Sequence, residues 1–233
     1  MIADVHSHIL PGIDDGSASL EESAALLTML KEQNVPWVAA TPHFYPSQDR
    51  PQRFLERRAG ALERLREFLG DRADMPAIVP GAEVYYFPGM GDSDVLKELT
   101  FGDSRYVLVE MPMRTWTDVM FRDLEKIYEK QDLIPVIAHV DRYIGPLRDY
   151  GIPGRLAELP VLVQANAGFF LRTSTRSMAL RMLKKGRIHL LGSDCHSLDR
   201  RPPRIGEAVE VIRRKLGEAA LEQLAENAKE IYP

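Results

Sequence analysis

The sequence predicts an α/β fold built on a parallel β-sheet, and three observations lead to this class. Seven short apolar runs, rich in Val and Ile, recur along the chain, and each ends at Gly, Pro or a polar residue. Helix-length amphipathic segments separate most of these runs, which is typical of a parallel sheet. The chain has 233 residues, of which 45% are hydrophobic, so it can bury one sizeable core. We therefore expect a single domain over residues 1–233.

The seven apolar runs are the predicted strands, and their order along the chain is clear. They are IADVH (2–6), WVAATPH (37–43), AIVPGAEVYY (77–86), YVLVEMP (106–112), IPVIAHV (134–140), VLVQANAG (161–168) and IHLLGSDCH (188–196). Each is short enough to be a buried strand. The pattern alone leaves two architectures open, an open doubly wound sheet and a barrel closed with seven staves.

The predicted helices fill the intervals between these strands. The first is SLEESAALLTMLKEQN (19–34), in which Ser19 caps the N-terminus and Glu22 completes a capping box. An apolar stripe then follows along one face of this helix. The remaining predicted helices cover residues 52–69, 117–130, 174–185 and 203–226.

Composition and charge exclude several classes of function. The chain has 30 basic and 34 acidic residues and a net charge of -4, which argues against a nucleic-acid groove or a polybasic membrane contact. No apolar run approaches the roughly 18–20 residues of a membrane span, so we expect no membrane insertion. The N-terminus has no basic leader, and the single cysteine, Cys195, forms no internal disulfide. We expect a cytoplasmic protein, and the sequence makes no prediction of oligomeric state.

Side chains that bind metals stand at the carboxyl ends of six of the seven predicted strands. The sixth strand ends instead in Gln164 and Asn166. The carboxyl ends of parallel strands converge, and barrel enzymes build their active sites there. His189, inside the last run, is the exception among the six histidines and is interpreted as a packed or hydrogen-bonded residue. The strand-end set is His6, His8, His43, Glu83, Glu110, His139, Asp194 and His196, and the acidic pair Asp14-Asp15 follows the first strand.

The spacing of these residues favours metal binding over packing. Residues i and i+2 of a strand point to the same side, so His6 and His8 can grip one ion, as can Asp194 and His196. Burial of so many carboxylates and imidazoles, paired only with one another, would carry a large desolvation cost. The number of ligands exceeds the needs of one ion, so we expect two or three ions with a bridging carboxylate. Mixed imidazole and carboxylate ligation suits Mn, Fe or Zn.

Six stretches resemble the polymerase-and-histidinol-phosphatase (PHP) superfamily, and within it the CpsB/YwqE-type bacterial protein-tyrosine phosphatases. The resemblance covers nearly the whole chain, from Asp4 to Pro203. The features most specific to this branch are LPG-x-DDG after His-x-His and a final Asp-x-His followed by Arg-Pro-Pro. The stretches are DVHSHILPGIDDGS, ATPHFYP, GAEVYY, VLVEMP, AHVDRY and GSDCHSLDRRPP.

The resemblance implies a distorted, TIM-like (β/α)7 barrel of the PHP fold with a trinuclear centre of divalent metals. Manganese is the first expectation, and iron or zinc are alternatives. The implied ligands of the three ions are His6, His8, Glu83 and Asp194; then Glu83, Glu110 and His139; then Asp15, His43 and His196. Two positions depart from the pattern of many relatives: Phe44 replaces a second histidine, and Cys195 replaces a methionine. Whether Phe44 changes substrate preference is left open.

The resemblance also implies a reaction, the hydrolysis of phosphotyrosine by attack of a metal-bridging hydroxide. Arg142 and Arg201 lie in sequence where they can fork onto the phosphate. Asp194 or His139 is expected to move a proton to the leaving oxygen, and the sequence does not decide between them. The implied substrate is a phosphotyrosine protein, a bacterial tyrosine kinase of capsule or exopolysaccharide biosynthesis.

Three other functions remain open at this point. A small-molecule phosphatase, such as one for histidinol phosphate, would use the same metal chemistry. A PHP-type phosphodiesterase or nuclease would need a basic track, which the net charge does not favour. A regulatory module would hold structural metals with closed coordination.

One further motif and a group of aromatic residues need interpretation. Cys195 and Arg201 have the C-x5-R spacing of cysteine-dependent tyrosine phosphatases. The loop between them has no Gly and contains Asp199, so it is a poor phosphate cradle, and we interpret the match as coincidence. Asp14 is interpreted as a turn residue or a residue that supports the ligands. The aromatic side chains near strand ends, candidates to flank a phosphotyrosine ring although packing is the commoner role, are Phe44, Tyr45, Tyr85 and Tyr143.

Overall fold

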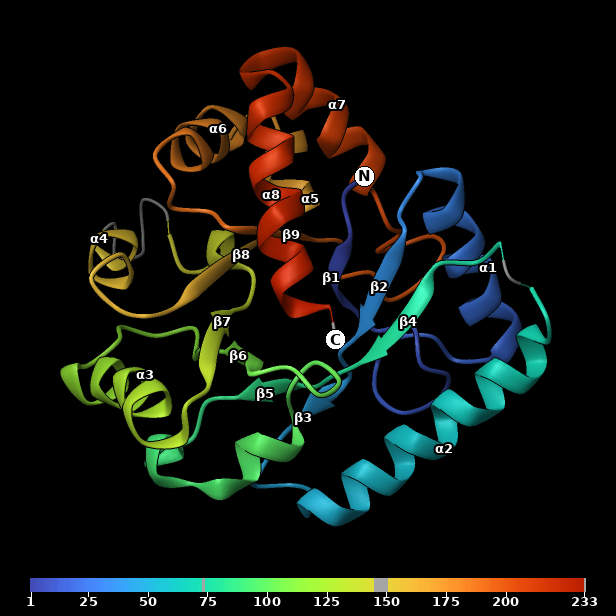
Figure 1. Ribbon diagram of the computed structural model, residues 1–233, viewed down its shortest axis with the longest axis horizontal. Helices are drawn as coiled ribbons and strands as arrows, with labels where there is room; N and C mark the ends of the chain where they lie inside the picture. The colour runs from blue at the N-terminus through green and yellow to red at the C-terminus, as the bar shows by residue number, and fades with distance from the viewer. Residues whose placement is uncertain (73, 145–150, 233) are drawn as a thin grey trace.

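Short parallel strands lie at the centre of the molecule, and helices surround them (Figure 1). This computed structural model describes residues 1–72, 74–144 and 151–232. The α/β class with a parallel sheet is confirmed. The strands are β1 (Asp4–Ser7), β2 (Trp37–Ala40), β3 (His43–Phe44), β4 (Ala77–Pro80), β5 (Glu83–Tyr85), β6 (Tyr106–Glu110), β7 (Ile134–Ile137), β8 (Leu162–Asn166) and β9 (Leu190–Gly192).

The strands form two parallel sheets, in the orders β1-β2-β4 and β3-β5-β6-β7-β8-β9. The predicted strands 37–43 and 77–86 were expected to be continuous, and this is wrong, because each is divided into two short strands. The divisions fall at Thr41-Pro42 and at Gly81-Ala82, where Pro42 cannot donate a ladder hydrogen bond. Backbone hydrogen bonds still cross the gap, since the Gly81 amide donates to Ala40 and the Glu83 amide donates to Pro42.

β1 of the first sheet lies next to β9, the last strand of the second sheet, so the two sheets together form one strongly curled surface. The Asp194 amide donates to the His6 carbonyl at 2.8 Å, and the His8 amide donates to the Cys195 carbonyl at 2.9 Å. Ser7 and Cys195 form a parallel bridge just beyond the end of β9. The carboxyl ends of strands from both ends of the chain therefore meet at one place.

Most predicted helices are present, with one division and several additions. The helix predicted over 203–226 is wrong as a single element, because Gly217, with φ of 84°, separates two helices. Ser19 caps the first helix by accepting from the Glu22 amide, but the Glu22 carboxylate accepts from the Ala18 amide. The helices are α1 (Leu20–Glu32), α2 (Pro51–Leu69), α3 (Asp118–Gln131), α4 (Ile152–Leu156), α5 (Ala167–Leu171), α6 (Arg176–Lys184), α7 (Ile205–Leu216) and α8 (Glu218–Ile231), with 3-10 turns η1 (Met90–Asp92), η2 (Asp94–Glu98) and η3 (Val140–Arg142).

The core divides into two buried clusters. The larger one packs the helices against the strands and contains Phe44, Phe54 and Leu124. The smaller one gathers residues of several strands together with Ala228 and Ile231 of α8. Within the described ranges, no helix combines the length and the apolar character that crossing a membrane requires.

Candidate metal centre

One carboxylate oxygen of Glu83 lies at the centre of the converging strand ends. Glu83 Oε2 lies 3.0 Å from His43 Nδ1, 3.2 Å from His6 Nε2 and 3.3 Å from His8 Nε2. These three imidazoles come from β1, from the residue after it and from β3, so the strand-end prediction brings distant residues together. The side chain of Glu83 is fully buried. An oxygen surrounded by ring nitrogens in this way needs protons or cations between them.

The predicted ligands form three overlapping groups. Within each group, the candidate ligand atoms all lie within 4.8 Å of one another. The groups are His8, Asp15, His43 and His196; His6, His8 and Asp194; and His43, Glu83 and Glu110. The grouping differs from the sets that the family resemblance implies. His8 also joins the group of Asp15, and His43 takes the place of His139 beside Glu83 and Glu110. Glu83 is not in the group of His6, His8 and Asp194, and His139 is in none of the three groups.

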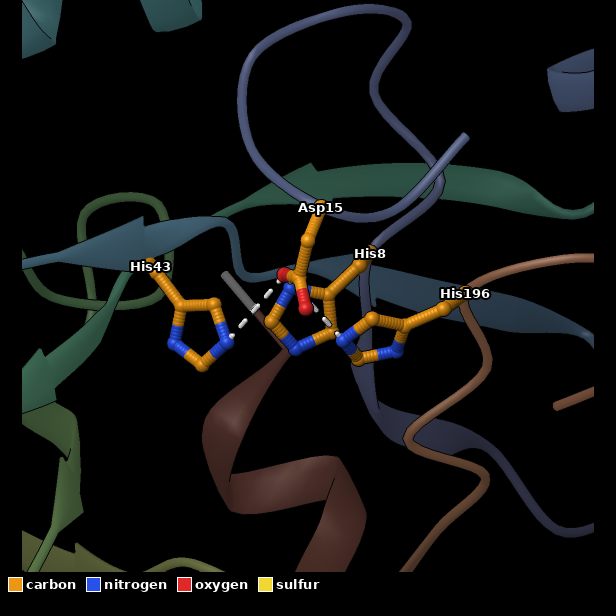
Figure 2. Close-up of side chains that lie close together, drawn as sticks. All are labelled: His8, Asp15, His43 and His196. Atoms are coloured by element: carbon orange, nitrogen blue, oxygen red, sulfur yellow. Dashed lines mark ion pairs between the residues drawn. The ribbon is translucent and has the colours of Figure 1, made fainter. Parts of the chain in front are cut away.

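Asp15 stands over the histidines at the open side of the centre (Figure 2). Its Oδ1 atom lies 3.5 Å from His43 Nε2 and 3.5 Å from His196 Nε2. Figure 2 shows the carboxylate between these two rings and next to the ring of His8. The Asp15 side chain is 68% exposed, whereas the His196 side chain is only 5% exposed. This group therefore faces solvent on one side, where a substrate can approach.

His139 and Glu110 complete the opposite end of the centre. His139 Nε2 lies 2.7 Å from Glu83 Oε1 and 3.5 Å from Glu110 Oε1. Arg142 Nη1 lies 3.6 Å from the same Glu110 oxygen. All nine predicted ligands thus lie in one continuous cluster around Glu83.

Unusual backbone conformations aim two of these side chains. His139 and Asp194 have φ of 31° and 55°, in the left-handed region that residues other than Gly rarely adopt. Such strain is typical of functional sites. The register between β1 and β2 also shifts, because Asp4 pairs with Val38 whereas Ser7 pairs with Ala40. This irregularity lies between Asp4 and Ser7, the stretch that contains His6, and changes the direction of the strand as bulges do near active sites.

Asp14 supports the ligands and is not part of the three groups. Its Oδ2 atom lies 2.7 Å from His8 Nδ1 and accepts from the His43 amide at 2.9 Å, while Oδ1 accepts from the Gly16 amide. The turn is tight at Gly16, where an added Cβ would lie 2.3 Å from the His8 carbonyl oxygen. These contacts agree with the interpretation of Asp14 as a turn and supporting residue.

Sequence reasoning gave no role to Gln164 and Asn166, yet they connect the ligands. Gln164 Oε1 lies 3.2 Å from His6 Nδ1 and accepts from the His139 amide at 2.6 Å. Gln164 Nε2 donates to Asn166 Oδ1, and Asn166 Nδ2 donates to Asp194 Oδ2 at 2.9 Å. Their place at the end of the sixth strand, where other strands present acids, was the signal that could have identified them.

The two predicted phosphate-binding arginines meet at one acid. Arg142 and Arg201 both pair with Asp194 Oδ2. Their side chains are 32% and 39% exposed, so each guanidinium lies between the buried acid and solvent. They come from η3 and from the loop after β9 and converge from different parts of the chain. A phosphate placed over the cluster can therefore be held by both forks.

The pKa values in the cluster respond to its density of charge. Burial opposes charge on His8, but its contacts with the negatively charged Asp14 and Glu83 raise its pKa to about 10. Burial acts in the same direction on His139, and Glu110 and Glu83 raise its pKa to about 9. Burial would raise the pKa of Glu83, but His6, His139 and His43 hold it well below its usual value. His8 and His139 thus favour their protonated forms, whereas burial and the charges of His8 and Arg201 lower the pKa of His196 to about 4.

This set of donors fits divalent metal ions. Among the described residues, the buried atoms Glu83 Oε2, His43 Nδ1 and His196 Nε2 make no hydrogen bond, although each lies close to other candidate ligands. Unpaired buried donors and acceptors of this kind are costly unless something binds them. Imidazole nitrogens and carboxylate oxygens are ligands for Zn, Mn and Fe.

The remaining candidate residues have ordinary packing roles, with one exception. Phe44 is 1% exposed and packs against Phe54, with ring centroids 5.0 Å apart, so its ring belongs to the core. Tyr143 is also buried, and its hydroxyl accepts from the Met111 amide. Tyr45 is the exception, because its half-buried ring stacks on His43 at a centroid distance of 5.2 Å. Tyr85 lies next to it, with the two ring centroids 5.6 Å apart.

Cys195 and His189 are not among the candidate ligands of the metal centre. The Cys195 side chain is fully buried in the larger core cluster, and burial raises the pKa of its thiol well above the usual value. A reactive cysteine needs the opposite, a lowered pKa and access to substrate. His189 precedes β9 and accepts from the Val163 amide through Nδ1, as expected of a hydrogen-bonded residue.

Comparison with known proteins agrees with the predicted resemblance. The family described as capsular polysaccharide synthesis, CpsB/CapC, matches residues 2–232. Tyrosine-protein phosphatase CpsB of Streptococcus pneumoniae is 31% identical over 239 residues, which cover 98% of this chain and 94% of the relative.

Solved structures support the same relationship. A structure from work on YwqE of Bacillus subtilis and CpsB of Streptococcus pneumoniae, described as metal-dependent tyrosine phosphatases, superposes with a TM-score of 0.87. It is 25% identical, and the match covers 99% of this chain and 94% of that one. Histidinol phosphate phosphatase of Lactococcus lactis shares the fold, with a TM-score of 0.59, 14% identity and 94% of each chain covered. The chain belongs to the CpsB/CapC family.

Proposed function

We propose that this chain is a metal-dependent protein-tyrosine phosphatase. The observation that carries the proposal is the arrangement around Glu83, where one buried carboxylate oxygen faces three imidazoles beside two arginines that share Asp194. The similarity to CpsB of Streptococcus pneumoniae, named a tyrosine-protein phosphatase, supports the substrate class. Both point to cleavage of a phosphate monoester.

We propose that the centre holds three divalent ions, with manganese as the first candidate and iron or zinc as alternatives. The three overlapping groups of donors support this number. The residues that would hold the ions are His6, His8, Asp15, His43, Glu83, Glu110, His139, Asp194 and His196. When bound, such ions activate water near neutral pH and neutralise charge on the phosphoryl oxygens.

The arginines position the phosphate in this proposal. Arg142 and Arg201 pair with Asp194 without substrate, and each fork has room to turn because it is partly exposed. Bound phosphate offers the same bidentate hydrogen bonds as the carboxylate, together with more negative charge. Asp194 and His139 are the candidates to hold the proton that the leaving oxygen takes.

In this proposal, the aromatic ring of the phosphotyrosine lies beside Tyr45. This residue lines a hollow of about 400 Å³ together with Asp15 and His43, so the hollow opens at the exposed side of the cluster. The Tyr45 ring already stacks on His43. Aromatic rings stack favourably at offset geometries, which supports a phenyl leaving group here.

The physiological substrate we propose is a tyrosine kinase of capsule or exopolysaccharide synthesis. The description of the CpsB/CapC family, capsular polysaccharide synthesis, supports this context. We further propose that residues 1–233 form one domain and that the strands close into a distorted barrel of seven staves. The bridge between Ser7 and Cys195 and the cluster that joins several strands to α8 support closure.

Metal reconstitution of the metal-free protein tests the function. Mn, Fe, Zn and Mg would each be added, and hydrolysis of a phosphotyrosine peptide would be compared with that of histidinol phosphate. We expect peptide hydrolysis with at least one ion, its loss on chelation, and its loss in His8→Ala. Turnover of histidinol phosphate with no turnover of peptide would instead identify a small-molecule phosphatase.

A further inference from the structure

A second hollow lies beside Asp194 and has a basic lining. Its volume is about 650 Å³, and Arg142 and Asp194 form part of its wall, so it adjoins the metal centre. The lining also includes residues of α5, of the loop after β9 and Arg204, the residue before α7. We call it the arginine hollow after its basic side chains, which are Arg142, Arg172, Arg200, Arg201 and Arg204.

Two of these arginines have no acidic partner in the described ranges. Arg142 and Arg201 pair with Asp194, and Arg204 holds Glu207 through two contacts of 2.6 Å. No ion pair to a described residue engages Arg172 or Arg200, and both are exposed.

The acids in the lining do not cancel this charge. Asp194 is already shared by two arginines. Asp141 is only partly exposed, and its Oδ1 accepts from the Asn166 amide. Asp199 is exposed at the edge. The hollow is therefore basic, although the whole chain has a net charge of -4.

The opposite flank of the metal centre has a different character. The hollow beside Tyr45 is lined by three acids, Asp14, Asp15 and Asp49, and by two arginines, of which Arg57 pairs with Asp49. The arginine hollow reverses this ratio, with five arginines and three acids. The arginine hollow is thus the more basic of the two.

We propose that the arginine hollow binds a second anionic group of the same peptide whose phosphotyrosine occupies the metal centre. The inference rests on the proposed phosphatase function and extends it to the sequence around the target tyrosine. Arg172 and Arg200 are the residues that distinguish substrates, because no acid of the described residues pairs with them and each guanidinium group can form two parallel hydrogen bonds with a carboxylate or a phosphate. The second group is either an Asp or Glu side chain or another phosphorylated residue.

The test compares matched phosphotyrosine peptides with the metal-loaded protein. Residues flanking the phosphotyrosine would be Glu in one peptide, phosphotyrosine in a second, Gln in a third and Lys in a fourth. We expect kcat/KM to be about three- to tenfold higher for the Glu peptide than for the Gln peptide, as two partly exposed ion pairs predict. Comparison of the first two peptides identifies which anion is preferred, and the ratio should shrink as ionic strength rises.

Variants then assign the preference to this hollow. In Arg172→Ala/Arg200→Ala, the Glu-to-Gln ratio should fall close to one, whereas Arg181→Ala on α6, which does not line the hollow, should keep it. Arg172→Glu/Arg200→Glu should favour the Lys peptide instead. Affinities for the same peptides carrying a non-hydrolysable phosphonate give a readout that does not depend on turnover.

The outcomes separate failure of this inference from failure of the proposed function. Equal turnover of the Glu, phosphotyrosine and Gln peptides by the unaltered protein overturns the inference alone. A preference that survives in the double variants also overturns it, because other residues would then be responsible. Hydrolysis of p-nitrophenyl phosphate without hydrolysis of any phosphotyrosine peptide contradicts the proposed function, and this inference with it.

Discussion

Asp14 Oδ2 lies 2.7 Å from His8 Nδ1 and leaves the other ring nitrogen, Nε2, directed at Glu83, 3.3 Å away. This relationship fixes which nitrogen of His8 can meet a cation. A carboxylate behind a ligating histidine orients the ring and raises its basicity. Asp14 thus acts on the centre through His8.

Removal of this carboxylate should weaken metal binding. We expect Asp14→Ala to lower the affinity for metal about 10- to 100-fold, the usual effect of losing such a partner. Titration calorimetry on the metal-free protein would measure it. Asp94→Ala, at an exposed site on η2, is the matched control. Unchanged affinity in Asp14→Ala would mean that the contact does not orient His8.

Gln164→Leu should destabilise the protein and disturb two ligands. The change leaves His6 Nδ1 and the His139 amide without their partner. A buried group without a hydrogen bond costs about 1–3 kcal/mol, and two such groups arise here, so the free energy of unfolding should fall by about 2–6 kcal/mol. Urea denaturation would measure it, with exposed Gln223→Leu for comparison. A loss in Gln164→Leu no larger than that in Gln223→Leu would contradict the hydrogen-bond explanation.

Loss of either phosphate-binding arginine should reduce turnover. Arg142→Ala and Arg201→Ala are each expected to lower kcat/KM for a phosphotyrosine peptide about 10- to 100-fold, since a hydrogen bond to a charged group contributes roughly 1.5–3 kcal/mol. Lys at either position keeps the positive charge but cannot form two parallel hydrogen bonds with the phosphate. Arg142→Lys and Arg201→Lys should therefore recover little of the lost kcat/KM. Steady-state kinetics would show the effect. Arg105→Ala removes an exposed pair with Asp132 and a contact with the Tyr128 ring, away from the metal centre, so this variant should keep the kcat/KM of the unaltered protein.

Cys195→Ala should keep most of the activity, and a chelator should abolish it. The thiol is fully buried, and its raised pKa disfavours the thiolate that a cysteine-dependent mechanism requires. Assays of the variant with and without chelator separate the two mechanisms. An inactive but folded Cys195→Ala, together with indifference of the unaltered protein to chelator, would overturn the metal-dependent mechanism. Circular dichroism would establish that the variant is folded.

Metal uptake by the metal-free protein should release protons. The pKa of His8 is raised to about 10 and that of His139 to about 9, so both rings are protonated at neutral pH, whereas a ligating imidazole is neutral. Affinity should therefore rise about tenfold per pH unit for each displaced proton between roughly pH 6.5 and 9. Calorimetry in buffers of different ionisation enthalpy would count the protons. Affinity independent of pH across this window would contradict these protonation states.

The raised pKa values of His8 and His139 also predict how the stability of the metal-free protein depends on pH. Because the folded-state pKa values of His8 and His139 lie above the unfolded value of about 6.5, their stabilising contribution is complete below that pH. It is lost as pH rises through 9 to 10. Thermal unfolding across this range would record the loss of stability, and this loss should be smaller in Asp14→Asn.

Much of the fold could be predicted because its signals are local. Alternation of apolar runs with amphipathic segments identified the parallel α/β class, and Ser19 marked the start of α1 through the spacing of its capping residues. The divisions of the strands at Pro42 and of the last helix at Gly217 were missed, since either residue is tolerated near an element's end and its effect depends on packing. The positive φ of His139 and Asp194 had no signal in sequence.

The sequence by itself determined which residues are available for the centre: ligands at strand ends, and pairs such as His6 and His8 whose two-residue spacing directs both side chains to one side. The tertiary structure alone decided how they are shared. It placed Glu83 among three imidazoles, put Asp14 behind His8, and brought Arg142 and Arg201 onto Asp194. The physical reason is that side-chain direction follows from the period of a strand. Distances of about 3 Å between residues of different strands depend instead on twist, register and local strain, which long-range packing sets.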